Sequence, residues 1–252
     1  MTPEDPPGPI VRNELQHAAH RNGWRIEDGV DGGWLLRRSS SAPGRVGLAG
    51  AGPQGPWFLA VDHPGVAAEL GEPAAGLSGP GVARFALPDA RALHAALGRV
   101  WELAVALPDH PLRRFEAETA ELPRGTEAER LVVQRKGQDV FRESLLAYWG
   151  GRCPLTGITD TALLKASHMK PWADCATDAE RLDPYNGLLL SALWDAAFDA
   201  GLVSFDDAGA LLLSPHLTTT ARDALGAAPQ LPLAPAHQPY LRWHRDRVFR
   251  RR

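Results

Sequence analysis

The spacing of hydrophobic positions changes several times along the first half of the chain. In VRNELQHAAHRNGW, the apolar residues from Val11 to Ala19 fall on one stripe at helical spacing. The segments GWLLRRS and PWFLAVD are short and apolar, as in strands, and a Gly-, Pro- and Ser-rich stretch that must turn repeatedly lies between them. PDARALHAALGRVWELAVAL again has helical spacing and ends at Pro108. The order helix, strand, strand, helix predicts a small α+β domain over residues 11–115.

The second half begins with a connector rich in Pro and Glu. Thr126, with Glu129 three residues later, forms a capping-box pattern that predicts the start of a long helix, which Gly150 and Gly151 end. LLKASH then predicts a strand ending at His168, Asn186-Gly187 a turn, LLLSALWDAAFD a helix, and VSFDDAGALLLS a hairpin. We therefore expect a second domain over residues 116–252, with a linker helix and a basic C-terminal tail, and an α+β fold overall.

Length and composition restrict the class of protein. The chain has 252 residues, 44% of them hydrophobic and 23% charged, which is ordinary for one large or two modest globular domains. We expect residues 1–10 to form a disordered lead-in, and they lack the features of a signal peptide. No apolar stretch is long enough to span a bilayer. The two cysteines, Cys153 and Cys175, do not suggest a disulfide scaffold. We expect a cytoplasmic protein with no membrane contact.

The distribution of charge is more informative than its sum. The formal net charge is −3. The last eleven residues, RWHRDRVFRRR, hold six Arg and one Asp. Such a tail can contact phosphates, or it can be a solvated basic terminus, and the tail alone does not decide between the two.

Candidate chemistry gathers between residues 157 and 199. Asp195 and Asp199 lie at i and i+4 of the expected helix, so their carboxylates share one face and repel each other unless a cation lies between them. Taken alone, such a pair is more often a solvated helix face, and a single histidine such as His168 is more often structural. The order and spacing of His168, Asn186 and the two aspartates together favour a metal-dependent site.

These residues fall in segments that resemble a known family. CPLTGI (153–158), ASHMKPW (166–172), RLDPYNGLLL (181–190) and WDAAFDAGLVSF (194–205) are similar to the HNH endonuclease superfamily, the ββα-metal nucleases. They resemble above all the branch with the pattern SH(I/M)KPW, NGLLL and D..FD, which occurs in restriction-type nucleases. The resemblance implies that a two-stranded hairpin and a helix hold one divalent ion.

The resemblance also implies a role for each matching residue. His168 would activate water, Asn186 would orient that histidine through its backbone or its side chain, and Asp195 and Asp199 would bind the metal. Ser167 would be at most a weak ligand, and Trp172 would be a packing residue. The expected contacts to substrate phosphates come from four basic residues: Lys165, Lys170, Arg135 and Arg142.

The donor atoms indicate the metal. The histidine that closes the family's name is replaced by Asp199, and carboxylates favour Mg²⁺ or Mn²⁺ over Zn²⁺. Cys153 has no second cysteine two to four residues away, so a structural zinc is not expected.

The sequence thus predicts a metal-dependent DNA endonuclease of restriction or defence type. Residues 11–115 are expected to form a DNA-recognition domain that reads modified bases. Its Gly-rich loop around 41–56 could approach DNA beside Trp34 and Trp57, although a core position for these tryptophans is the favoured interpretation. Two alternatives remain open: a nuclease toxin or mobile-element nicking enzyme, and a catalytically inactive HNH-fold DNA-binding protein. A homodimer would allow one active site per chain to cut both strands.

Overall fold

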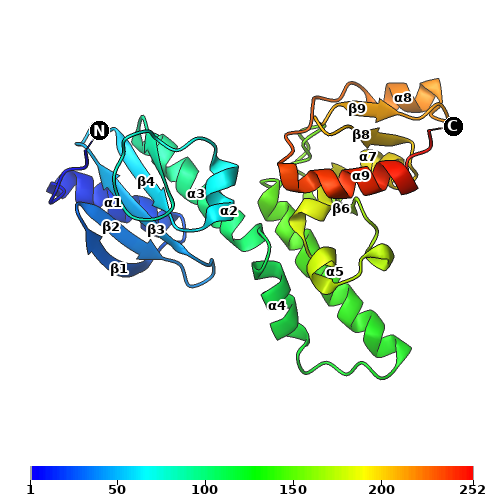
Figure 1. The fold of residues 1–252 in the computed structure, drawn as a ribbon, viewed down its shortest axis with the longest axis horizontal. Helices are drawn as coiled ribbons and strands as arrows, with labels where there is room; N and C mark the ends of the chain where they lie inside the picture. Colours follow the sequence, from blue (N-terminus) through cyan, green and yellow to red (C-terminus); the bar gives the residue numbers. More distant parts are fainter. Residues whose placement is uncertain (1, 252) are drawn as a thin grey trace. The chain divides into compact units, whose positions relative to one another are not determined.

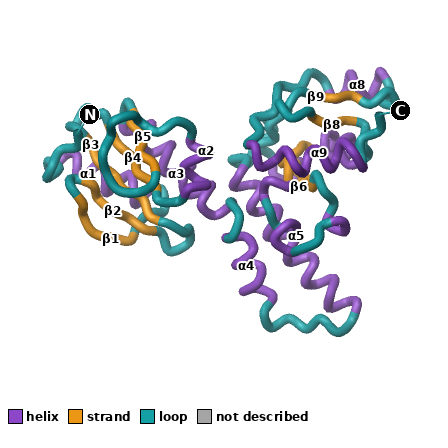
Figure 2. Tube along the Cα trace, in the orientation of Figure 1, coloured by secondary structure: helices purple, strands orange, loops and turns teal. Residues whose placement is uncertain are grey.

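A computed structural model describes residues 2–251 and divides the chain into two compact units. The first unit ends at Leu107 and the second begins at Pro108. Both contain helices and antiparallel strands, so the fold class is α+β (Figures 1 and 2). The helix from His110 to Thr119 spans the boundary expected at residue 115 and belongs wholly to the second unit.

The first unit is a five-stranded antiparallel sheet with three helices. Its strands lie in the order in which they occur in the chain, from β1 to β5. The helices α1 and α3 pack against each other and against the central strands β3 and β4. The elements are α1 Pro9–Arg21, β1 Ile26–Asp31, β2 Trp34–Arg38, β3 Arg45–Gly50, β4 Trp57–Val61, α2 Pro64–Leu70, β5 Ala83–Leu87 and α3 Ala90–Ala106.

The sequence predicted only two of these five strands. The Gly-rich stretch expected to be a loop contains β3, a central strand that pairs with both β2 and β4. Glycine is used here for close packing: a Cβ on Gly47 would lie 3.3 Å from the Trp34 ring and 2.9 Å from Pro80. Trp34 and Trp57 are each only 2% exposed, so they belong to the core and do not stack on a flipped base.

The lead-in expected to be disordered is attached to this sheet. The Glu4 amide donates a hydrogen bond to the Gly50 carbonyl, and the Glu4 carboxylate accepts one from the Gly8 amide. Helix α1 begins directly afterwards, at Pro9, where a missing N–H costs nothing.

The second unit is built around one long helix, two short hairpins and a C-terminal helix. Its core is a single apolar cluster that includes Phe141, Leu145, the three leucines 188–190 and Phe198. The elements are α4 His110–Thr119, α5 Glu127–Tyr148, β6 Leu164–His168, α6 Asp178–Arg181, β7 Gly187–Ser191, α7 Ala192–Asp199, β8 Val203–Phe205, β9 Leu211–Leu213, α8 Thr219–Leu225 and α9 Gln238–Arg247, with 3₁₀ turns at Thr161–Leu163, Trp172–Asp174, Pro184–Asn186 and Pro235–His237.

Several local predictions in this unit are confirmed and one is wrong. The capping box at Thr126 forms, with both reciprocal bonds to Glu129. The 206–209 turn joins β8 to β9, with the Gly209 amide bonded to the Asp206 carbonyl. The segment LLLSALWDAAFD is not one helix, because Leu188 to Ser191 extend β7 and the helix starts only at Ala192. Strand β7 pairs with β6, and every residue of β7 is buried. A continuous apolar run fits such a buried strand as well as it fits a buried helix.

The first six residues of the basic tail, 242–247, form the end of α9, and residues 248–251 follow the helix, with the Arg250 amide bonded to the Gly201 carbonyl. Within the tail, the guanidinium of Arg245 donates to the Phe205 carbonyl and pairs with Asp207, so this arginine stabilises the β8–β9 hairpin. In the part of the chain that the structure describes, no helix is both long enough and apolar enough to cross a bilayer.

A buried histidine next to α9 makes the stability of this unit sensitive to acid. His237 is fully buried, packs against Trp149 and other aromatic rings, and has a buried Nε2 without a hydrogen-bond partner. Burial lowers its pKa from 6.5 to about 4, against an opposing effect of the Ala234 carbonyl. Between about pH 6.5 and 4, the unfolded chain therefore binds a proton at His237 that the folded chain does not. The contribution of His237 to the free energy of unfolding is fully present above pH 6.5 and is lost as the pH falls toward 4.

We expect His237→Phe, which keeps an aromatic ring in place, to reduce the loss of stability at acidic pH. The contribution of His237 is at most about 3 kcal/mol, from a pKa difference of roughly 2.5 units. His168 and His244 have the same direction of shift, so the variant should keep a shallower dependence on pH. Denaturant midpoints at pH 5 and pH 7.5 measure the effect. An identical pH dependence in variant and wild type would contradict it.

Candidate active site

The hairpin β6–β7 and the helix α7 bring together the residues that the sequence singled out. Strand β6 pairs antiparallel with β7, with His168 opposite Gly187. Helix α7 follows β7 without a connecting loop, because Ser191 is both the last strand residue and the N-cap of the helix. The end of β6, the start of β7 and one face of α7 therefore form a compact ββα arrangement.

The imidazole of His168 is held on three sides. Its ring stacks on Phe141 of α5, with 3.7 Å between the ring centroids and 14° between the planes, and meets Trp172 edge-on. Its Nε2 lies 2.9 Å from the Arg181 carbonyl oxygen, which can only accept a hydrogen bond. The proton of the neutral ring is therefore on Nε2, and the basic lone pair is on Nδ1. Burial lowers the pKa of His168 to about 4, so the ring is neutral at pH 7, as a general base must be.

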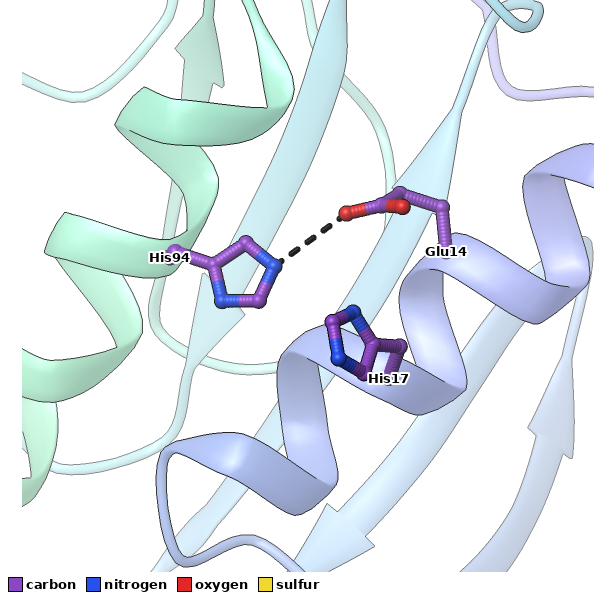
Figure 3. A group of neighbouring side chains, drawn as sticks. All are labelled: Glu14, His17 and His94. Atoms are coloured by element: carbon purple, nitrogen blue, oxygen red, sulfur yellow. Dashed lines mark hydrogen bonds and ion pairs between the residues drawn. The ribbon is translucent and has the colours of Figure 1, made fainter.

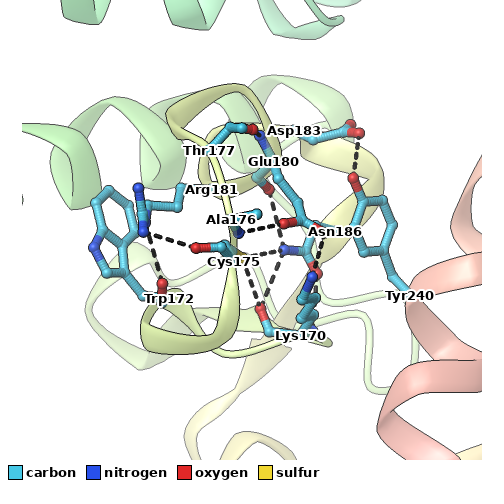
Figure 4. A network of polar contacts seen from close by, with 10 residues as sticks. All are labelled: Lys170, Trp172, Cys175, Ala176, Thr177, Glu180, Arg181, Asp183, Asn186 and Tyr240. Atoms are coloured by element: carbon cyan, nitrogen blue, oxygen red, sulfur yellow. Dashed lines mark hydrogen bonds and ion pairs between the residues drawn. The ribbon is translucent and has the colours of Figure 1, made fainter.

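Asn186 organises the loop that supplies the Arg181 carbonyl. It is completely buried, and its Oδ1 accepts a hydrogen bond from the Lys170 amide at 2.8 Å. Its Nδ2 donates to the carbonyls of Lys170 and Glu180, at 3.1 and 3.2 Å, and lies 3.4 Å from Cys175 Sγ. Figure 4 shows the carboxamide at the centre of these contacts. Asn186 thus closes the 170–180 loop on itself. Its side chain reaches His168 only through the neighbouring Glu180–Arg181 backbone, while its own carbonyl accepts a hydrogen bond from the amide of Met169, the residue after His168.

Arg181 is a site residue that the sequence does not predict. Besides its carbonyl contact with His168, its guanidinium donates to the carbonyls of Trp172 and Cys175 (Figure 4). The guanidinium also pairs with Asp178. One side chain thus ties the start, middle and end of the loop together. The resemblance includes Arg181 at the start of RLDPYNGLLL, but a contact made by a backbone carbonyl leaves no signature in residue type.

Asp195 and Asp199 lie one turn apart on α7, as their spacing predicts. The Ser167 hydroxyl donates a hydrogen bond to Asp195 Oδ1, which connects β6 to α7 and orients that carboxylate. Partial enclosure of Asp199 and the charge of Asp195 raise the pKa of Asp199 to about 6. A partly buried carboxylate beside a second carboxylate, as Asp199 is, gains from a cation placed between the two.

A cleft joins the histidine to the carboxylate face. It has a volume of about 370 Å³ and is lined by Ser167, His168, Trp172, Asp199 and His244. His244 of α9 does not offer a free nitrogen to this cleft, because its Nδ1 pairs with Ser204 Oγ at 3.0 Å and its Nε2 lies 3.1 Å from the Phe198 carbonyl. It instead holds the end of α7, next to Asp199.

The four basic residues expected to contact substrate have different surroundings. Lys165 and Arg135 are exposed. Lys170 pairs with Glu180 at 2.6 Å, and Arg142 donates to the carbonyls of Leu164 and Thr161. Lys170 and Arg142 therefore already stabilise the loop and the start of β6, which makes Lys165 and Arg135 the freer candidates for phosphate contacts.

The donor set fits a hard divalent ion. Mg²⁺ is usually held by one or two carboxylates, while waters and substrate phosphates complete its coordination shell. The two carboxylates on one face of α7, beside the cleft, match this arrangement. A closed zinc site would need further ligands. Among residues 2–251, no third His, Cys, Asp or Glu side chain lies close enough to these two carboxylates to form such a cluster. The residues present thus fit Mg²⁺ or Mn²⁺ better than Zn²⁺.

A comparison with protein families finds a match over the segment that forms this site. Residues 153–206 match the model of a family described as HNH endonuclease. The match covers the His168 strand, the Asn186 loop, β7 and α7. The C-terminal half of the chain therefore contains an HNH endonuclease domain, which indicates a nuclease that acts on nucleic acid and, as HNH nucleases generally do, uses a divalent metal. No curated protein matches the chain.

Proposed function

From an HNH endonuclease domain in the C-terminal half, we propose that this protein is a metal-dependent DNA endonuclease that hydrolyses phosphodiester bonds. The observation that carries the proposal is the shared cleft, which is lined both by His168, whose lone pair is on Nδ1, and by Asp199. A base and a metal-binding face on the same cleft are what in-line hydrolysis of a phosphodiester requires.

In this proposal each group has one task. His168 takes a proton from the attacking water through Nδ1, while the Arg181 carbonyl holds the ring in the required tautomer. Asp195 and Asp199 would hold Mg²⁺ or Mn²⁺, which supplies charge stabilisation at the phosphoryl and leaving oxygens. Ser167 orients Asp195, and Asn186 fixes the loop that carries the Arg181 carbonyl. Lys165 and Arg135 would contact the phosphate backbone.

The finer proposal is restriction or defence activity, with the first unit reading the DNA and choosing modified bases. Its support is the two-unit organisation, in which a separately packed α+β unit precedes the HNH unit. Trp34 and Trp57 are excluded as stacking partners by their burial, so base recognition has to use other residues of that unit. A homodimer that cuts both strands is part of the same proposal.

A digestion panel tests the substrate. Matched plasmids that are unmodified, or that carry 5-methylcytosine, 5-hydroxymethylcytosine or N6-methyladenine, are incubated with the full chain and Mg²⁺ or Mn²⁺, with RNA of similar length as a control. We expect cleavage of DNA, and at least about tenfold faster cleavage of one modified plasmid, since a contact worth 1.4 kcal/mol produces this factor. Equal rates on all plasmids would remove the modification specificity. Cleavage of RNA alone would contradict the DNA endonuclease.

A further inference from the structure

Two helices of the first unit bring three metal-ligating side chains together, far along the chain from the HNH residues. Glu14 and His17 project from α1 at i and i+3, and His94 projects from α3. One ligand atom of each lies within 4.8 Å of the other two. Figure 3 shows the three side chains pointing toward a common point between the helices. Among residues 2–251, this is the only such group of three or more His, Cys, Asp and Glu side chains.

The distances are close to those of a zinc site. His94 Nε2 and Glu14 Oε1 are 3.1 Å apart, and the rings of His17 and His94 have centroids 5.4 Å apart. Zn–N and Zn–O bonds of about 2.0–2.2 Å place tetrahedral ligand atoms roughly 3.3–3.5 Å from each other. His17 is exposed, so a small rotation of its side chain completes the set without moving the helix.

The helices beneath the cluster are rigidly packed. Val11 and Leu15 of α1 and Leu93 and Leu97 of α3 are each at most 1% exposed. The backbone positions of the three ligands are therefore fixed by the core before any ion binds, which lowers the cost of forming a site. Two imidazoles and one carboxylate are a donor set that suits Zn²⁺ and that Mg²⁺ does not prefer.

We propose that Glu14, His17 and His94 bind one Zn²⁺, with water at the fourth position. The ion links α1 to α3, two helices separated by the 68 residues 22–89 of the chain, and so stabilises the first unit. This site is independent of the proposed nuclease activity, because its ligands, its unit and its preferred metal all differ from those of the HNH domain.

The metal-free arrangement of His94 competes with the ion. Asn22 Nδ2 lies 3.1 Å from His94 Nδ1 and also donates to the Ala18 carbonyl, which places the ring proton on Nε2, facing Glu14. With Zn²⁺ on Nε2, that proton would move to Nδ1 with no net release, and the Asn22 carboxamide would turn to offer Oδ1 to it, giving up its bond to the Ala18 carbonyl. A ligand histidine whose other nitrogen donates to an oxygen is the usual arrangement at metal sites.

The test compares two exposed histidines of the same helix. The full-length wild type, His17→Gln and His20→Gln are titrated with Zn²⁺ against a chromophoric chelator, in excess Mg²⁺ to occupy the Asp195–Asp199 face. We expect the wild type and His20→Gln to bind one Zn²⁺ with equal affinity, and His17→Gln to bind it more than about tenfold more weakly, since even changes around a metal ligand reduce affinity by this factor. No Zn²⁺ binding by the wild type, or equal affinities in all three proteins, would overturn the proposal.

A second readout separates this site from zinc bound elsewhere. An ion that bridges α1 and α3 binds the folded state and not the unfolded chain, so it raises the unfolding temperature. Zn²⁺ is therefore expected to raise the melting temperature of the wild type and of His20→Gln and to leave that of His17→Gln nearly unchanged. Equal shifts in the three proteins would show that the zinc is bound by other residues, and the assignment to this cluster would be wrong.

Discussion

His168→Ala is expected to lower the rate of DNA cleavage by about 10²–10⁴-fold, the usual contribution of a general base. The ring removed is the one whose Nε2 bonds to the Arg181 carbonyl and whose Nδ1 is left to accept a proton. The measurement is the single-turnover rate on supercoiled plasmid with Mg²⁺. Added imidazole should restore part of the rate, because the truncated side chain leaves its space open to the 370 Å³ cleft.

Two further variants distinguish loss of the base from loss of the fold. His168→Gln keeps a side chain that can bond to the Arg181 carbonyl and should be as inactive as the alanine variant. His216→Ala changes an exposed histidine of the same unit and should cleave at the wild-type rate. Cleavage by His168→Gln within a few-fold of the wild type would show that the ring is structural.

Replacing both helix carboxylates, Asp195→Asn with Asp199→Asn, is expected to reduce cleavage by about 10³-fold or more. A bound divalent ion supplies several kcal/mol to the transition state, and each 1.36 kcal/mol corresponds to a factor of ten. The fold should tolerate the change, since the substitutions also remove the burial of a charged group and the repulsion by Asp195, which together raise the pKa of Asp199. Initial rates over a range of Mg²⁺ concentrations measure the loss.

Asp223→Asn is the matched control for this pair, because Asp223 is an exposed acid on α8 of the same unit. Its rate and its Mg²⁺ dependence should equal those of the wild type. A doubly substituted protein that still cleaves with the wild-type Mg²⁺ dependence would place the metal elsewhere.

The candidate site was more predictable from sequence than the fold around it. The spacing of Asp195 and Asp199 by four residues requires no tertiary information, because the helix period alone puts them on one face. The strand that ends at His168 was likewise visible in its local pattern. The route from the Asn186 side chain to the histidine is not, because it passes through the Arg181 carbonyl, and any residue type can supply a carbonyl at that position.

The same contrast holds for the elements. The boundaries of α5 follow from a capping box and two glycines that act locally, and they were predicted well. The sequence predicts a helix over Leu188–Ser191, because a buried strand and a buried helix are equally apolar; only pairing with β6 decides between them. Strand β3 was hidden for a different reason: its glycines admit the Trp34 ring to the sheet, and such close packing is a tertiary property.

The most direct test of the central claim is the metal dependence of cleavage by the full-length wild type. Supercoiled plasmid is incubated with the protein in Mg²⁺, in EDTA, and in EDTA followed by an excess of Mg²⁺ or Mn²⁺. If Asp195 and Asp199 hold the metal, we expect cleavage with Mg²⁺, no cleavage with EDTA, and recovery when either ion is added back. The protein that carries both Asp195→Asn and Asp199→Asn should be inactive under all of these conditions. Cleavage that continues in EDTA, or that the double variant retains, would contradict the central claim.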